Sequence, residues 1–248
     1  MLVLSVNPPR EKMNRFSETL VLLITLGLLG YSGIVYADPY LDFNMDATHP
    51  TGALISYAGG TGALTGFSLS VDTVTGFESP NNSGVTLTIV GGRLNFTTGS
   101  FAGNDPNNWY FGGGGSITIT GGIDLDPNKY GLEIPLDSTL LSGTFTSANV
   151  TNIGGRFKIA GASFDDWKDQ QLTDFYGLPN LSGNAYDYSG NFNISFFASG
   201  SPPQAFQSSS ILSGDVVNNP VPEPATVSLF GCGLIGLAWF GRRKSRKV

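Results

Sequence analysis

The sequence predicts an all-β fold, an antiparallel β-sandwich of jelly-roll type with one short helix, flanked by an apolar helix at each terminus. Three observations predict it. Short runs alternate apolar and polar residues, Gly-Gly or Gly-Ser steps close most of these runs, and long apolar stretches occur near the two ends of the chain. A β-helix or solenoid is the alternative, because 34 of the 248 residues are glycine.

Alternation along the middle of the chain predicts about ten short strands with one buried face. In "GVTLTIVGG", Val85, Leu87 and Ile89 fall on one face and threonines on the other. In "SITITGG", Ile117 and Ile119 do the same, and similar runs are "RLNFTTG", "RFKIAG" and "NFNISFFASG". Glycine pairs after such runs favour turns that need positive φ.

One segment, "ASFDDWKDQQLTDFYGLPN", breaks this pattern and predicts a helix over residues 164–176. Ser163 is a suitable N-cap, and the acidic residues after it suit the first turn of a helix. Gly177 and Pro179 would end the helix. The following polar run 199–210 is expected to be a loop.

Residues 1–37 have the layout of a secretory signal peptide, and Met13 offers a second start within them. Arg15 supplies a short positive region, the stretch 20–30 is apolar, and "VYA" places small residues before a cut between Ala37 and Asp38. A retained anchor helix is the alternative. Cleavage is favoured because the apolar run is short for a stable span.

The other end of the chain predicts a membrane stop. Residues 225–241 carry no charge, and a helix of that length reaches roughly 25 Å, slightly less than a hydrocarbon core of about 30 Å. A basic tail, 242–248, follows this stretch and is expected to stay in the cytoplasm. Its charged members are Arg242, Arg243, Lys244, Arg246 and Lys247. The body, 38–217, is then extracytoplasmic, joined to the span by a spacer over 218–224.

The motif Val221, Pro222, Glu223 and Pro224 stands before the apolar helix, and the Arg-Arg-Lys cluster follows that helix. Together these features resemble the PEP-CTERM sorting signal. The resemblance implies a Gram-negative bacterial protein that a membrane-embedded exosortase cuts near the Pro-Glu-Pro element and delivers to the cell surface or matrix. It also implies an association with exopolysaccharide and biofilm. Both prolines hold the motif extended, which suits a processing enzyme's cleft.

Composition limits the partners of the body. Between residues 38 and 220 there are 16 acidic and five basic residues, a net charge of −11. A nucleic-acid partner is not expected, because the basic footprint is missing. Cys232 is the one cysteine of the chain and lies in the tail, so the body cannot form an internal disulfide.

A calcium site is a candidate at "DLDPNKYG", where Asp124, Asp126 and Asn128 stand at alternate positions. The EF-hand pattern then fails, because Lys129 replaces the required glycine. The alternative is an Asp-Pro-Asn turn whose side chains bond their own backbone. No other cofactor is expected.

A glycan site is a candidate at Trp109 and Tyr110, whose rings could stack on a sugar; the alternative is that they fill the core. His49 is the one histidine of the chain and is expected in an exposed turn. A single histidine excludes a two-histidine zinc site, and a Ser-His-Asp triad is hard to build around it.

The sequence therefore predicts a non-enzymatic, exported protein with a structural or adhesive role. Its expected partners are signal peptidase, exosortase, the inner membrane during sorting, and extracellular polysaccharide. A glycan-binding module, assisted by calcium, is the alternative. A polysaccharide hydrolase ranks below both, because no pair of carboxylates is singled out.

Overall fold

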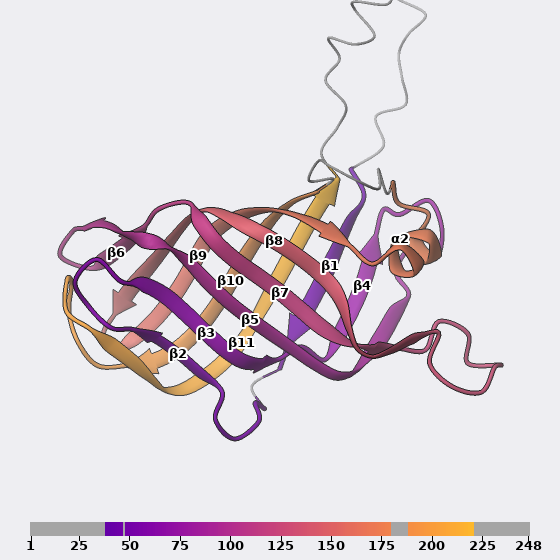
Figure 1. Ribbon diagram of the computed structural model, residues 1–248, viewed down its shortest axis with the longest axis horizontal. Coiled ribbons are helices and arrows are strands. Elements are labelled where there is room, and N and C mark those ends of the chain that lie inside the picture. The colour runs from indigo at the N-terminus through magenta and orange to yellow at the C-terminus, as the bar shows by residue number, and fades with distance from the viewer. Residues whose placement is uncertain (1–37, 47, 180–187, 221–248) are drawn as a thin grey trace, which may run out of the picture. The chain divides into compact units, whose positions relative to one another are not determined.

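The computed structural model describes residues 38–220, apart from residue 47 and residues 180–187. These residues form eleven strands and one helix (Figure 1). In chain order they are β1 Tyr40–Met45, β2 Leu54–Tyr57, β3 Ala63–Ser70, β4 Thr73–Phe77, β5 Thr86–Asn104, β6 Asn108–Phe111, β7 Gly114–Ile123, β8 Ile134–Ile153, β9 Arg156–Lys168, α2 Gln170–Tyr176, β10 Tyr188–Ala198 and β11 Phe206–Pro220. The predicted signal peptide and the predicted transmembrane helix lie outside the described residues.

All pairings between the described strands are antiparallel, which confirms the all-β antiparallel class with one short helix. A β-helix stacks parallel strands, so this alternative does not describe the chain. Hydrogen bonding runs from β1 through β4, β5, β7, β8, β9, β10 and β11 and returns to β1. The strands therefore form one continuous sheet.

Opposed parts of this sheet face each other across an apolar core. Phe96 of β5 and Phe192 of β10 belong to strands that do not pair, yet their ring centroids lie 5.2 Å apart. The inward residues are those that alternation predicts: Ile117 and Ile119 are fully buried. The alternation rule fails at Val85, which precedes β5 and is 41% exposed.

The helix is shorter than predicted and begins later. Residues 164–168 belong to β9, and α2 begins after Asp169, whose side chain accepts a hydrogen bond from Leu172 N at 3.1 Å. The predicted cap at Ser163 is therefore wrong, because that residue lies within a strand. The predicted end is confirmed: Gly177 takes the left-handed conformation, with φ 68°.

A tyrosine fastens α2 to the sheet. Tyr176 is buried, and its hydroxyl donates to the carbonyl oxygens of Val74 at 3.1 Å and Val85 at 2.9 Å. Its ring covers Gly76, where an added Cβ would lie 2.3 Å from a ring carbon. Burial raises the pKa of Tyr176 to about 12, so this hydroxyl remains a donor at neutral pH.

The last strand extends past the predicted end of the folded body. β11 runs to Pro220, and Asn218 is fully buried. The boundary at 217 and the start of the spacer at 218 are therefore corrected: residues 218–220 belong to the sheet. The expected loop over 199–210 is also shorter, because β11 begins at Phe206.

Candidate functional site

Val221, Pro222, Glu223 and Pro224, the predicted span and the basic tail 242–248 lie outside the described residues, as does Ala37 on the other side of the body. What the structure does place is the end of the folded body, at Pro220 of β11. The motif therefore begins directly where the described sheet ends.

Trp109 is a core residue. Its side chain is fully buried, its ring centroid lies 5.0 Å from that of Phe206 and 5.2 Å from that of Phe157, and its Nε1 donates to Gln204 O at 3.1 Å. An indole with no exposed surface cannot stack on a sugar, so the ligand assignment of Trp109 is corrected in favour of the core alternative.

Tyr110 is exposed and fastens a polar turn. Its hydroxyl donates to Asp105 Oδ2 at 2.7 Å, and Asp105 Oδ1 also accepts from the backbone N–H groups of Asn107 and Asn108. The Tyr110 hydroxyl and these donors lower the pKa of Asp105 to about 2.

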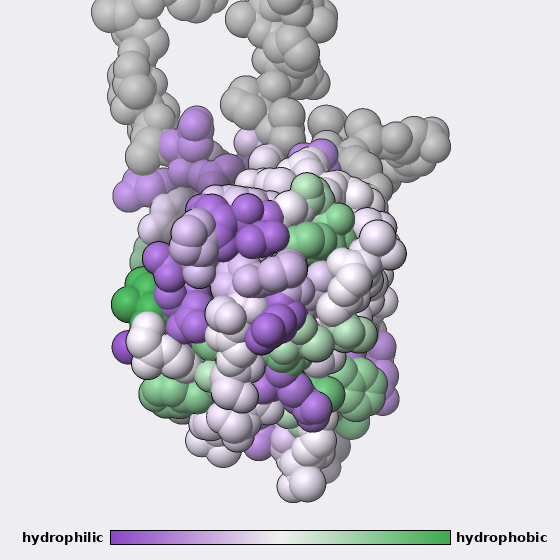
Figure 2. Space-filling model, turned by 90° about the vertical axis from the view of Figure 1, so that its left-hand side faces the viewer, coloured by the Kyte–Doolittle hydropathy of each residue, from purple (hydrophilic) through white to green (hydrophobic). Residues whose placement is uncertain are grey.

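Hydrophilic and hydrophobic residues are interspersed over the face of the molecule drawn in Figure 2.

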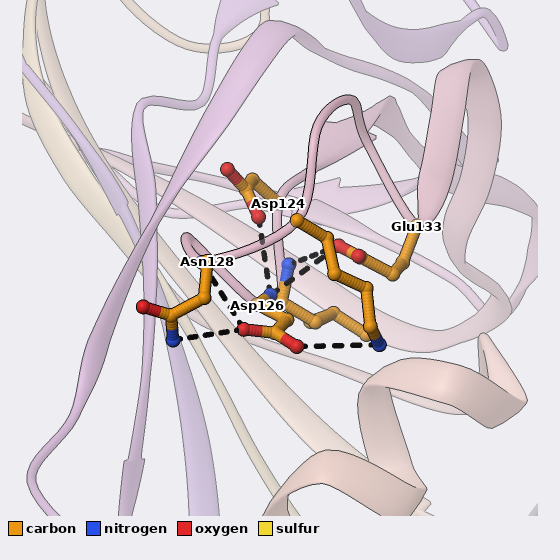
Figure 3. A network of polar contacts seen from close by, with 6 residues as sticks. Asp124, Asp126, Asn128 and Glu133 are labelled. Atoms are coloured by element: carbon orange, nitrogen blue, oxygen red, sulfur yellow. Dashed lines mark hydrogen bonds and ion pairs between the residues drawn. The ribbon is translucent and has the colours of Figure 1, made fainter.

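The predicted calcium residues do come together, but as a turn (Figure 3). Asp126 Oδ1 accepts from the backbone N–H and the side-chain amide of Asn128, both at 3.1 Å, and Asp126 Oδ2 pairs with Lys129 Nζ at 3.2 Å. Asp124 Oδ1 accepts from Asp126 N at 3.1 Å. The carboxylate oxygens thus point at N–H donors of their own loop, as the Asp-Pro-Asn alternative predicts.

Glu133, the residue before β8, completes this loop. Its Oε2 accepts from Leu125 N at 2.8 Å and from Asp126 N at 3.3 Å. The bond to Leu125 N is the main reason that the pKa of Glu133 is lowered. Across the described part of the chain, no group of three or more His, Cys, Asp and Glu side chains is arranged to hold a metal ion.

His49 is half-buried and structural, which corrects the expectation of an exposed turn residue. Ser70 N donates to its Nδ1 at 3.0 Å, so Nε2 carries the proton and donates to Leu212 O at 3.0 Å. The imidazole therefore joins the end of β3 to β11. A cavity of about 230 Å³ beside it is lined by His49, Pro50, Ala53 and residues 208–211.

A buried polar centre, which the sequence analysis did not anticipate, lies among β9, β10 and β11. We define it as Asp166, Lys168 and Asn218, all of them at most 3% exposed. Lys168 Nζ donates to Asp166 Oδ1, and Asn218 Nδ2 donates to Asp166 Oδ2. One carboxylate therefore holds an amine on one oxygen and an amide on the other.

The neighbouring strand β10 shapes this centre. Lys168 Nζ lies 3.8 Å from the centre of the Tyr188 ring, and this cation–π contact is shielded from water. Gly190 pairs with Asn218 on one side and with Phe164 on the other. A Cβ at Gly190 would lie 2.3 Å from Asn218 Nδ2 and 2.1 Å from a Phe164 ring carbon, so glycine makes the room that lets Asn218 reach Asp166.

The signal for this centre was present in the sequence as alternation. Phe157, Ile159, Ala162, Phe164, Asp166 and Lys168 are the buried residues of β9. Extending the alternation beyond Phe164 places Asp166 and Lys168 inward and Trp167 outward, and Trp167 is indeed 45% exposed. The predicted helix over 164–176 concealed this pattern, because it placed Asp165 and Asp166 in a solvated first turn.

A polar groove lies on the outer surface over β1, β9, β10 and β11. It encloses about 540 Å³ and is lined by Asn44, Lys158, Asn193, Ile194, Ser195, Ser213, Gly214 and Asp215. On the same strands Asp42 has a raised pKa, first because it is partly buried and second because Asp215 is near. The groove offers amide, hydroxyl, ammonium and carboxylate groups, the kinds of group that bind hydroxyl-rich ligands.

Comparison with known families bears on the tail. Residues 220–244 match the model of the PEP-CTERM protein-sorting motif. The chain carries a PEP-CTERM sorting signal. The signal implies export, a transient membrane anchor and processing by an exosortase. No curated protein and no solved structure matches the chain.

The PEP-CTERM match does not bear on the activity of the body, because it covers residues 220–244, of which only Pro220 belongs to the sheet. Within the residues that the structure describes, no helix has the length and apolarity needed to cross a membrane. The predicted span 225–241 falls beyond those residues.

Proposed function

We propose that this protein is a non-enzymatic structural or adhesive component of the cell surface or extracellular matrix, associated with exopolysaccharide. The PEP-CTERM signal carries the proposal, because it directs a chain to the exosortase route. The signal begins at Pro220, the last residue of the sheet, so an exosortase cut near Pro-Glu-Pro leaves the described body whole.

The body supports a structural role through the uses of its polar groups. Asp105, Asp126 and Glu133 accept hydrogen bonds from their own loops, His49 joins two strands, and Asp166 lies in the core. Each of these side chains is bonded to groups of the protein itself. An enzyme needs such groups directed at a substrate.

The experiment is fractionation of cells that express the tagged chain. Replacing Pro222, Glu223 and Pro224 together by alanine is expected to leave the protein in the membrane fraction and to remove it from the surface and matrix. Pro106→Ala, in an exposed loop between β5 and β6, is the matched control and should sort normally. A triple variant that reaches the matrix as well as the control does would overturn the sorting part of the proposal.

A second candidate function is glycan binding, favoured by the polar groove. Asp215 lines the groove and accepts from Asn193 Nδ2 at 3.4 Å. Retention of the protein on exopolysaccharide should fall when Asp215 is changed to alanine and Lys158 to methionine. Retention that persists in this variant, or that is absent from the wild-type chain, contradicts groove binding. Repeating the assay with a chelator tests the calcium expectation.

A further inference from the structure

The buried polar centre has an arrangement that suits covalent chemistry as well as packing. Lys168 supplies an amine, Asn218 a carboxamide and Asp166 a carboxylate that is hydrogen-bonded to both of them. All three side chains are buried, and Tyr188 covers the amine. We propose that Lys168 and Asn218 are joined by an isopeptide bond, formed with loss of ammonia and promoted by Asp166.

Burial is what makes Lys168 a nucleophile. In water an ammonium is stable and unreactive, but a buried ion pair loses the hydration that favours its charges. Transfer of one proton from Nζ to Asp166 Oδ1 removes both charges and leaves a neutral amine. The hydrogen bond between these two atoms is the path for that transfer.

The bonds and protons balance within the three side chains. The Nζ lone pair forms a bond to Asn218 Cγ, and the electron pair of the Cγ–Nδ2 bond departs with Nδ2. Of the two protons that Nζ gives up, one remains on Asp166 and the other leaves with Nδ2 as part of ammonia. No oxidant, metal or cofactor is required.

Asp166 is placed for both proton steps. Its Oδ1 contacts the nucleophile and its Oδ2 contacts Nδ2, the leaving group, so it can act as base at one and as acid at the other. The three groups are held by adjacent strands of one sheet, which removes most of the entropy cost of bringing them together.

The unreacted amide is also incompletely bonded. Asn218 Oδ1 is buried and has no hydrogen-bond partner among the described residues. A buried acceptor without a donor is costly. In the product, the protonated Asp166 carboxyl can donate a hydrogen bond to this oxygen.

The position of the bond suits a chain that is sorted through its C-terminal tail. Asn218 lies two residues before Pro220, where β11 ends and the sorting signal begins. A link to β9 would keep β11 in the sheet when the tail is held, and the described body has no cysteine for a disulfide at this place.

The test is peptide mapping of the full wild-type chain after denaturation and digestion with trypsin. An unlinked Lys168 releases the peptide Ile159–Lys168, "IAGASFDDWK". A linked Lys168 blocks that cut, and the fragment carrying both residues is lighter by one ammonia, about 17 Da. We expect the short peptide to be absent and the lighter fragment to be present.

Three variants separate the isopeptide from a succinimide at Asn218, which also loses ammonia. Lys168→Met, Asn218→Ser and Asp166→Ala should each restore the full mass, and Asn218→Ser should also release Ile159–Lys168. Asn191→Ser, on the outer face of β10, is the matched control and should keep the loss. Quantitative release of Ile159–Lys168 from the wild-type chain, or a mass loss that survives Lys168→Met, overturns the proposal.

Discussion

The molecule uses the same three residue types in two places, with opposite consequences. In the loop before β8, Asp126, Asn128 and Lys129 lie within four residues of one another, and the side chains of Lys129 and Asp126 are 68% and 37% exposed. In the buried polar centre, Asp166 and Lys168 are inaccessible and Asn218 comes from a strand 50 residues later in the sequence.

The difference teaches that environment, and not residue type, decides what such a cluster does. The exposed cluster is a local turn that water can replace bond for bond. The polar atoms of the buried one depend on partners within the protein, because water does not reach them. Substitutions in the two clusters should therefore differ in their effect on stability.

Removing one partner of the buried ion pair should have the largest effect. Lys168→Met removes both the amine that contacts Asp166 and the proposed link to Asn218, and the free energy of unfolding is expected to fall by at least about 3–5 kcal/mol. Urea titration followed by tryptophan fluorescence measures it. A fall of under about 1 kcal/mol would contradict both the buried contact and the link.

Filling the space beside Asn218 should have the next largest effect. Gly190→Ala places a Cβ within 2.3 Å of Asn218 Nδ2 and 2.1 Å of the Phe164 ring, and overpacking of this kind costs about 1–3 kcal/mol. The matched control is Gly112→Ala, where the nearest atom to the new Cβ is Ser100 O at 3.7 Å. Equal thermal midpoints for the two variants would contradict the close approach at Gly190.

The exposed turn at Asp105 provides a pH test. The folded-state pKa of Asp105 is lowered to about 2, so its contribution to stability is complete above its unfolded pKa and is lost as the pH falls toward 2. Tyr110→Phe removes the largest cause of the shift and should raise the pKa of Asp105. Carboxyl NMR titration measures this directly. Tyr130→Phe, an exposed control, should leave the Asp105 titration in place.

The exposed cluster should give the smallest effect. Lys129→Met breaks the ion pair with Asp126, whose pKa is already lowered chiefly by Asn128. Because both side chains are solvated, the urea midpoint is expected to match that of the wild type. A loss comparable to that of Lys168→Met would remove the distinction between the two clusters.

The strands were predictable from sequence where each face of the sheet is chemically uniform. Ile117, Ile119, Phe192, Ile194 and Phe196 alternate with polar residues, and all five are buried. Such runs carry their own register, because a slip of one residue would expose them all. Val85 fails because the strand begins after it.

The buried polar centre could not be predicted in full, for a physical reason. Local rules assign Asp165 and Asp166 to a helix start, but tertiary pairing with Thr144 and Gly143 of β8 keeps them in β9. Asn218 and Asp166 lie on strands that are separated by β10, so no local pattern pairs them. Alternation gives the face of each residue and not its distant partner.

The most direct test of the whole account is the intact mass of the protein recovered from the cell surface or matrix. The account predicts a mature chain that begins at Asp38 and lacks the apolar stretch 225–241 and the basic tail, because both ends have served only for export and sorting. A recovered protein whose mass includes residues 225–248 would contradict it.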